Sequence, residues 1–243
     1  MNKKILIIGD SCRDVHIYCS SNRMCPDKPV PILKIIDQSD NPGMAKNVYR
    51  NIKSIINSCD ILTNSNWYNI TKTRYIHKST NHMFFRLDSA EEIKRININS
   101  VKYNYDHIVI SDYDKGFLTE EDIEIITSNH DSVFLDTKKI LGAWANKVKF
   151  IKINNHEFER SKNYINSKIF QKTIKTCGEE GCYFLNKRFP VEQQEVIDVS
   201  GAGDSFLAGL VIEYSRSLDI EKSIKYANEC ASRVVSQKGV TIL

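Results

Sequence analysis

Short apolar runs alternate with longer stretches of helical periodicity along this chain. Ile5–Ile8 is a continuous apolar run, which is typical of a strand buried in a parallel sheet. Residues 107–153 repeat a rhythm of strand and helix, which predicts a parallel sheet with right-handed crossovers. The elements expected there are strands over His107–Ile110, Ser132–Leu135 and Val148–Ile153, and a helix over Thr119–Thr127 whose first turn is acidic.

Helical periodicity marks three further segments. Pro42-Gly43 is expected to form a turn that opens a helix over Ala45–Ile56. An apolar stripe predicts a last helix over Ile220–Val235. Another helix is expected to follow a β-prone run at Gln194–Ile197 and to continue to about Arg216. Three more strands are expected, over Asp60–Thr63, Ile169–Thr176 and Gly181–Leu185.

A second group of strands is expected to form a small lid sheet. Val15–Cys19 and Val30–Ile36 are two of them, and residues 73–87 alternate like a hairpin around Lys78–His82. We therefore expect one domain over residues 1–243, with lid strands drawn from about 12–39 and 71–88. The apolar face of a protruding sheet must be covered.

Composition excludes several classes of protein. The chain has 243 residues, with 41% hydrophobic and 26% charged residues, as in ordinary soluble domains. A net charge of +4 is too weak to indicate nucleic-acid binding, although an anionic substrate fits it. The seven cysteines include no C-x-x-C spacing and indicate reduced thiols. No apolar run is long enough for a signal peptide or a membrane span, so a cytoplasmic protein is expected.

The strongest chemical signal lies in Asp198–Leu210, where a glycine turn precedes a helix. Free amides and the positive end of the helix dipole make such a turn an anion site, here formed by Gly201, Ala202 and Gly203. A carboxylate beside a bound phosphate indicates a proton acceptor, so the hypothesis is a kinase with Asp204 as its base. The alternative is a tight turn in which Asp204 only caps the helix.

This stretch resembles the C-terminal signature of the ribokinase-like (PfkB) carbohydrate kinases. Other motifs follow in the order of that family, and the resemblance spans nearly the whole chain. They most resemble the branch that phosphorylates D-glycero-β-D-manno-heptose 7-phosphate at its anomeric oxygen. The motifs are Gly9-Asp10 with Asp14, Pro26–Pro31, Pro42–Val48, Thr71–Ile76, Phe85–Asp88, Ser111–Gly116 and Lys152–Glu157.

The resemblance implies a three-layer α/β fold with a small β lid, and ATP with Mg²⁺ as cofactors. Its residue roles carry over by motif. The sugar side would comprise Asp10, Asp14, Gly43 and Asn47, with Arg86 and Lys115 meeting the sugar's phosphate. The nucleotide side would comprise Asn154, Glu157, Gly178, Gly181, Asn228 and Ala231, with Glu157 holding Mg²⁺ partly through water. Asp198 and Ser200 resemble ligands of a monovalent cation such as K⁺.

Simpler roles remain open for several of these residues. Arg86, Lys115 and Arg74 are equally compatible with a solvated surface, and Lys152 with a solvated strand end. Asp198 and Ser200 could form only a hydrogen-bond network at the helix entry. Ala231 and the tryptophans Trp67 and Trp144 could serve packing, and the glycines at 178 and 181 could only turn a hairpin.

The chain departs from the family pattern at Met44, where a second glycine is usual, and at Lys46. Met44 either strains a backbone that needs positive φ or narrows the sugar pocket. Segments near residues 53–70 and after Glu157 are also shortened. The alternatives are therefore a kinase for another small sugar or sugar phosphate, and a non-catalytic binding remnant.

The resemblance also implies partners for the chain. Lids of such relatives often pair, which predicts a homodimer. Bifunctional relatives carry a nucleotidyltransferase half on the route to ADP-heptose for lipopolysaccharide. This chain ends at Leu243, so a separate nucleotidyltransferase is expected to act downstream.

Overall fold

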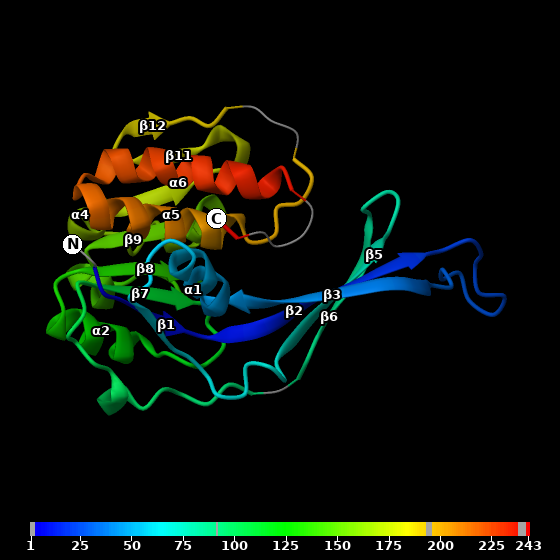
Figure 1. The fold of residues 1–243 in the computed structure, drawn as a ribbon. Helices are drawn as coiled ribbons and strands as arrows, with labels where there is room; N and C mark the ends of the chain where they lie inside the picture. Colours follow the sequence, from blue (N-terminus) through cyan, green and yellow to red (C-terminus); the bar gives the residue numbers. More distant parts are fainter. Residues whose placement is uncertain (1–2, 91, 193–195, 238–241) are drawn as a thin grey trace.

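The computed structural model describes residues 3–90, 92–192, 196–237 and 242–243 (Figure 1). One sheet contains β1 (Ile5–Gly9), β4 (Cys59–Leu62), β7 (His107–Asp112), β8 (Val133–Thr137), β9 (Phe150–Asn154), β10 (Thr173–Thr176), β11 (Cys182–Phe184) and β12 (Lys187–Phe189). A second sheet contains β2 (Ser11–Ser20), β3 (Lys34–Met44), β5 (Thr71–His77) and β6 (Met83–Asp88). The helices are α1 (Ala45–Lys53), α2 (Glu120–Asn129), α3 (Asn155–Ser161), α4 (Ser167–Phe170), α5 (Ala202–Ser217) and α6 (Ile220–Val235), with 3₁₀ turns at Ile98–Ser100, Ala143–Lys147 and Gly178–Glu180.

The central sheet has the strand order β12-β11-β10-β9-β8-β7-β1-β4. Along this order, neighbouring strands from β10 through β9, β8, β7 and β1 to β4 are parallel, and β11 pairs antiparallel with both β10 and β12. The prediction of a mostly parallel α/β sheet with crossovers is therefore confirmed. Parallel sheets of this kind direct the carboxyl ends of their strands to one edge, where ligands bind.

Two hydrophobic clusters cover the two faces of the central sheet. Neighbouring residues of a strand point to opposite faces, so Ile5 and Ile7 join one cluster while Leu6 and Ile8 join the other. The first cluster includes apolar residues of α1, α5 and α6, and the second those of α2. The result is three layers, with helices on both faces of the sheet.

The second sheet, with the order β3-β2-β5-β6, is the lid sheet, and Figure 1 shows it extending away from the central sheet. Cross-strand register places Val15 and Ile17 on one face, together with Tyr75 and Phe85. The opposite face carries Asp14, His16 and Arg74. The prediction of a small β lid is confirmed, and its two faces differ in chemistry.

The lid sheet contacts the rest of the molecule at the tip of its hairpin. Asn81, between β5 and β6, donates a hydrogen bond from Nδ2 to the carbonyl oxygen of Ile197 at 3.1 Å. Ile197 precedes the glycine turn of α5, so one polar contact joins the lid tip to the loop that leads into that helix.

The expected turn at Pro42-Gly43 is wrong, because β3 continues through it to Met44 and α1 begins at the next residue. Strand β3 lies at the edge of the lid sheet, where a proline leaves no ladder hydrogen bond unmade. The strand expected from Val30 begins only at Lys34, and the lid strands extend beyond residue 39.

Two other expected strands are also wrong in part. Ile169–Thr176 is divided between α4 and β10, because the Asn166 side chain accepts a hydrogen bond from the Ile169 amide at 3.0 Å and caps a helix. In the β-prone run 194–197, residues 194 and 195 lie outside the described residues. Val196 and Ile197 form no strand, and the Ile197 amide donates to the Val235 carbonyl at 2.8 Å. Strand β12 was not anticipated.

None of the helices in the described parts of the chain combines the length and apolar character that crossing a membrane requires. All seven cysteines are free thiols.

Candidate active site

Polar residues from distant parts of the chain meet at the carboxyl edge of the central sheet. Asp10 follows β1, Tyr113 follows β7, and Asp136 lies near the end of β8. The first turns of α1 and α5 reach the same place (Figure 1), because Asn47 of α1 is hydrogen-bonded to Asp204 of α5. Elements more than 150 residues apart in sequence therefore form one site.

The Asp204 carboxylate is held by two side chains. It is only 4% exposed, accepts a hydrogen bond from Asn47 Nδ2 at 2.9 Å, and accepts another from the Tyr113 hydroxyl at 2.6 Å. Asn51 Nδ2 donates to Asn47 Oδ1 at 3.3 Å, which orients the amide nitrogen of Asn47 toward Asp204. The N-cap of α5 is Gly201, so Asp204 does not occupy the cap position.

Burial raises the pKa of Asp204 to about 6, against the hydrogen bonds from Tyr113 and Asn47, which lower it. The same burial, together with the Asp204 charge, raises the pKa of Tyr113 well above its usual value, so its hydroxyl remains a donor. Asp204 is thus ionised at neutral pH yet more basic than an exposed aspartate. That combination suits a proton acceptor.

Gly201, Ala202 and Gly203 form the turn before Asp204 that the sequence predicts as an anion site, and this turn is here called the anion cradle. Gly201 has φ +80°, a left-handed conformation that glycine adopts without strain, and α5 begins at Ala202. A Cβ atom on Gly203 would lie 2.9 Å from Lys152 Nζ. Lys152 is only 4% exposed, so its interpretation as a solvated strand end is wrong.

Three of the residues expected on the sugar side lie near one another. The Asp14 carboxylate accepts a hydrogen bond from Arg74 Nη1 at 2.6 Å on the polar face of the lid sheet. Gly43 leaves room for it, because a Cβ there would lie 2.1 Å from Asp14 Oδ2. Asn47 follows in α1, directly beside Asp204. Arg74 is thus less solvated than its surface interpretation required.

Two other residues of that group have partners within the protein. Asp10 accepts hydrogen bonds from the amides of Tyr113 at 2.7 Å and Lys115 at 2.8 Å, so both carboxylate oxygens brace the loop after β7. Arg86 forms a bidentate pair with Asp88 on β6, at 2.7 and 3.0 Å.

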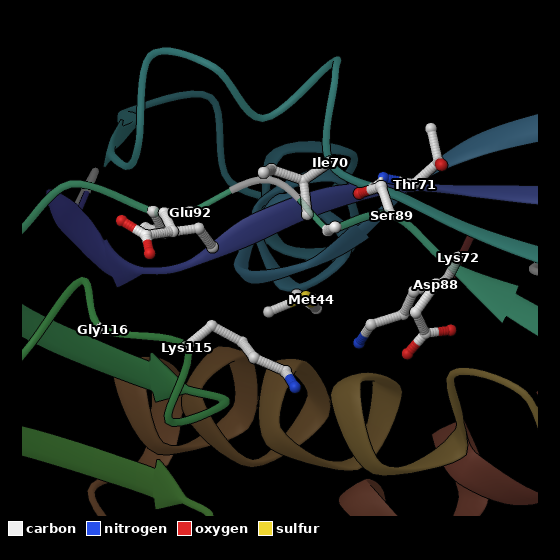
Figure 2. Close-up of a pocket in the computed structure, with 11 residues that line it drawn as sticks. Met44, Ile70, Thr71, Lys72, Asp88, Ser89, Glu92, Lys115 and Gly116 are labelled. Atoms are coloured by element: carbon white, nitrogen blue, oxygen red, sulfur yellow. Dashed lines mark hydrogen bonds between the residues drawn. The ribbon is translucent and has the colours of Figure 1, made fainter.

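A pocket of about 420 Å³, here called the smaller pocket, lies at the base of the lid sheet (Figure 2). Figure 2 shows the side chains of Lys72, Lys115 and Asp88 projecting into the same part of it, with Met44 in its wall. Met44 is 2% exposed and has φ +60°, so it both takes up a strained backbone conformation and fills space.

A larger pocket of about 610 Å³ includes Ala202 and Gly203 of the anion cradle in its lining. Six residues expected at the nucleotide or the cradle line it, namely Gly178, Gly181, Ala202, Gly203, Asn228 and Ala231. Sequence reasoning missed its apolar wall of Val191, Val196, Val199, Phe206 and Val235. An apolar wall beside an anion cradle suits a flat heterocycle joined to phosphates.

Asn154 and Glu157 form a capping box at the start of α3. Glu157 Oε2 accepts from the Asn154 amide at 2.7 Å, and Oε1 accepts from Asn154 Nδ2 at 2.9 Å and from Lys138. Asp198 accepts from the Ser200 amide at 2.8 Å in the turn before the cradle. Among the described residues, no three His, Cys, Asp or Glu side chains are grouped to hold a metal ion.

Sequence reasoning did not single out Tyr113, Asp136, Lys138 or Lys72 for a role. Tyr113 and Asp136 stand at or just after the carboxyl ends of parallel strands, and this position is a signal that could have found them. Lys72 gives no such signal, because its place in the smaller pocket depends on how the lid sheet lies against the central sheet.

Comparison with known proteins agrees with this geometry. Residues 57–243 match the family described as pfkB family carbohydrate kinase. The chain is 28% identical over 298 aligned positions to the bifunctional protein HldE of Helicobacter pylori strain HPAG1; the match covers 98% of this chain and 64% of that protein.

Solved structures resemble the whole chain. A ribokinase from Thermotoga maritima has a TM-score of 0.74 at 14% identity, with 98% of this chain and 94% of that chain covered. An Arabidopsis thaliana ribokinase complexed with ribose and ATP has a TM-score of 0.66 at 11% identity, with 98% and 94% covered. These likenesses confirm the ribokinase-like fold.

The pKa of Asp204 gives the first prediction. In a ¹³C NMR titration, the Asp204 carboxyl should change protonation near pH 6. The substitution Tyr113→Phe removes a donor that favours the charged form, so the midpoint should move to higher pH. Tyr105→Phe is the control, because that hydroxyl donates to the distant Asp60 and should leave the midpoint unchanged. A midpoint near pH 4 in the unaltered protein would contradict this description.

Proposed function

The chain belongs to the pfkB family of carbohydrate kinases and is an ATP-dependent kinase of that family, and we propose that its acceptor is a phosphorylated sugar. The favoured substrate is D-glycero-β-D-manno-heptose 7-phosphate, phosphorylated at its anomeric hydroxyl. The observation that carries the proposal is the buried Asp204 carboxylate, because its chain neighbour and its hydrogen-bond partner each connect it to one of the two pockets. Its neighbour Gly203 lines the larger one, and its partner Tyr113 precedes the loop that brings Lys115 to the smaller one.

The proposed step follows from this placement. The sugar hydroxyl attacks the terminal phosphorus of ATP, its proton passes to Asp204, and ADP leaves. The amides of Gly201, Ala202 and Gly203 would neutralise charge on the transferring phosphoryl group. Asn47 and Tyr113 keep the carboxylate in place, which supplies the positioning that phosphoryl transfer depends on.

The smaller pocket supports a substrate that carries its own phosphate. Lys72 and Lys115 present two ammonium groups to it, and Asp88 beside them is already paired with Arg86. Glu92 also lines the pocket, but Figure 2 shows it at the end away from the two ammonium groups. A dianionic phosphate placed between those ammonium groups would therefore meet positive charge. The sequence predicted Lys115 and Arg86 for this task. We now propose Lys115 and Lys72, with Arg86 offsetting the charge of Asp88.

The heptose assignment rests on the likeness to HldE, a bifunctional protein. The match covers 64% of that relative's length. A nucleotidyltransferase that acts on the product of the kinase is part of the proposal. The pathway would be the synthesis of ADP-heptose for lipopolysaccharide, in the cytoplasm where ATP and sugar phosphates occur. A kinase for another sugar, or a binding remnant, is the outcome that substrate screening would reveal instead.

Mg²⁺ would accompany ATP and neutralise charge on its phosphates. Both oxygens of Glu157 already accept hydrogen bonds, so contact through water fits this carboxylate better than direct coordination. Glu157 and Asn154 are the residues that would hold the hydrated ion. A monovalent cation at Asp198 and Ser200, such as K⁺, stays a prediction of the sequence.

A homodimer through the lid sheet is also part of the proposal. The apolar face of that sheet leaves Ile35, Phe85 and Leu87 between 49% and 59% exposed. Ile35 lies on β3 and the other two on β6, so apolar side chains reach both edges of the sheet. Monomeric proteins seldom leave a group of apolar side chains exposed like this, and a second copy of the chain would cover it.

Replacement of the base tests the proposed step directly. Asp204→Asn should lower kcat by about 10²–10⁴-fold, because the amide cannot accept the proton. The affinity for ATP should persist, since the larger pocket is unchanged. Coupled detection of ADP with a panel of sugars and sugar phosphates measures the rate, and calorimetry measures binding. Turnover close to that of the unaltered protein would contradict the role of Asp204.

Replacement of Lys72 or Lys115 tests whether the smaller pocket binds the phosphate of the sugar. Lys115→Met and Lys72→Met should each raise the KM for the sugar phosphate by about tenfold or more, because a charge-assisted hydrogen bond is lost. The KM for ATP should not change. Lys94→Met, an exposed lysine outside the smaller pocket, is the matched control. Equal effects of all three substitutions would count against this pocket as the phosphate site.

The dimer is tested by sedimentation. The unaltered protein should sediment as a dimer, and Leu87→Lys should shift it toward monomer, because a charge would be buried in the apolar contact. Tyr164→Lys introduces the same charge at an exposed residue outside the lid sheet and should have no effect. A monomer in the unaltered protein would refute the lid contact.

A further inference from the structure

A buried ion pair joins the central sheet to the anion cradle. Asp136 of β8 and Lys152 of β9 are direct partners in the parallel register, close to the carboxyl ends of both strands. Lys152 Nζ lies 2.7 Å from Asp136 Oδ2, and the side chains are 4% and 5% exposed. The same ammonium lies next to Gly203, whose missing Cβ would be 2.9 Å from it.

The carboxylates of Asp136 and Asp204 attract this ammonium, but two other electrostatic terms oppose its position. It lies at the first turn of α5, where the helix dipole presents its positive end and favours anions. It also has to be desolvated to lie there, and a buried pair seldom recovers that cost. Both costs fall if an anion occupies the anion cradle.

The pair is also incompletely hydrogen-bonded. An ammonium has three N–H donors, and among the described residues the Lys152 ammonium donates a hydrogen bond only to Asp136. The other carboxylate oxygen of Asp136, Oδ1, is buried, and no described residue forms a hydrogen bond with it. Lys138, the residue directly after β8, is different, because it pairs with Glu157 and is not among the atoms next to Gly203.

We infer that Lys152 is a catalytic residue that contacts the transferring phosphoryl group from below the anion cradle, with Asp136 as its positioning residue. The inference rests on the proposed function. Lys152 stays protonated throughout and donates N–H groups to the phosphoryl oxygens, while the hydroxyl proton goes to Asp204 and ADP leaves. Asp136 keeps one N–H engaged, so that the other two are directed at the phosphoryl group.

The test uses the full chain and removes the charge in two ways. Lys152→Met leaves Asp136 buried and unpaired, which endangers folding. The double variant Asp136→Asn with Lys152→Met removes both charges and keeps the fold testable. Lys149→Met is the matched control, because Lys149 precedes β9 at the opposite edge of the sheet, where it lies over the ring of Tyr214.

Turnover decides the inference if the unaltered protein phosphorylates a sugar. The double variant should then lose about 10²–10³-fold in kcat, the effect of removing one donor that stabilises transition-state charge, with the KM for the sugar and the Kd for ADP unchanged. Lys149→Met should retain the full rate. A kcat of the double variant within about threefold of the unaltered protein would overturn the role of Lys152, and the proposed function would stand.

Binding decides it if no sugar is phosphorylated, in which case the proposed function fails by itself. Calorimetry with ATP and ADP then measures the contact with the terminal phosphate. The double variant should lose about tenfold or more in affinity for ATP and none for ADP, because only ATP carries the phosphoryl group that Lys152 contacts. Equal changes for the two nucleotides would overturn the inference.

Discussion

Burial of the Asp204 carboxylate between two hydrogen-bond donors is the constraint on which the site depends. Desolvation raises its pKa toward 6, and the donors Asn47 and Tyr113 limit that rise. Asn47 comes from α1, Tyr113 from the loop after β7, and Asp204 from α5, so the balance exists only when both helices pack on the central sheet. The pKa of Asp204 therefore depends on how α1 and α5 pack against the central sheet.

Much of the fold and part of the site could be predicted from sequence. Apolar runs such as Ile5–Ile8 gave the parallel strands correctly because burial on both faces leaves a local signature. The glycine turn before Asp204 also showed its place at a helix start. The prediction failed where tertiary contacts decide, as at Pro42-Gly43, which forms an edge strand instead of a turn. At Lys152, burial excludes the solvated strand end that the sequence had left open.

Met44 illustrates how a departure from a family pattern is accommodated. Its left-handed backbone costs of order 1–3 kcal/mol for a residue other than glycine. The side chain packs into the hydrophobic cluster that also contains Ile8 and Ile70, and this burial offsets part of the strain. The same side chain lies in the wall of the smaller pocket, so a residue that the backbone barely tolerates also shapes what enters that pocket.

The contact between Asn81 and the Ile197 carbonyl has a thermodynamic consequence. Val196 and Val199, on either side of that carbonyl, form part of the wall of the larger pocket. Occupancy of one pocket and the resting position of the lid hairpin thus share a common segment of backbone. If nucleotide and sugar each bind more tightly to one placement of the hairpin, linkage requires that the factor by which nucleotide changes the affinity for sugar equals the factor by which sugar changes the affinity for nucleotide.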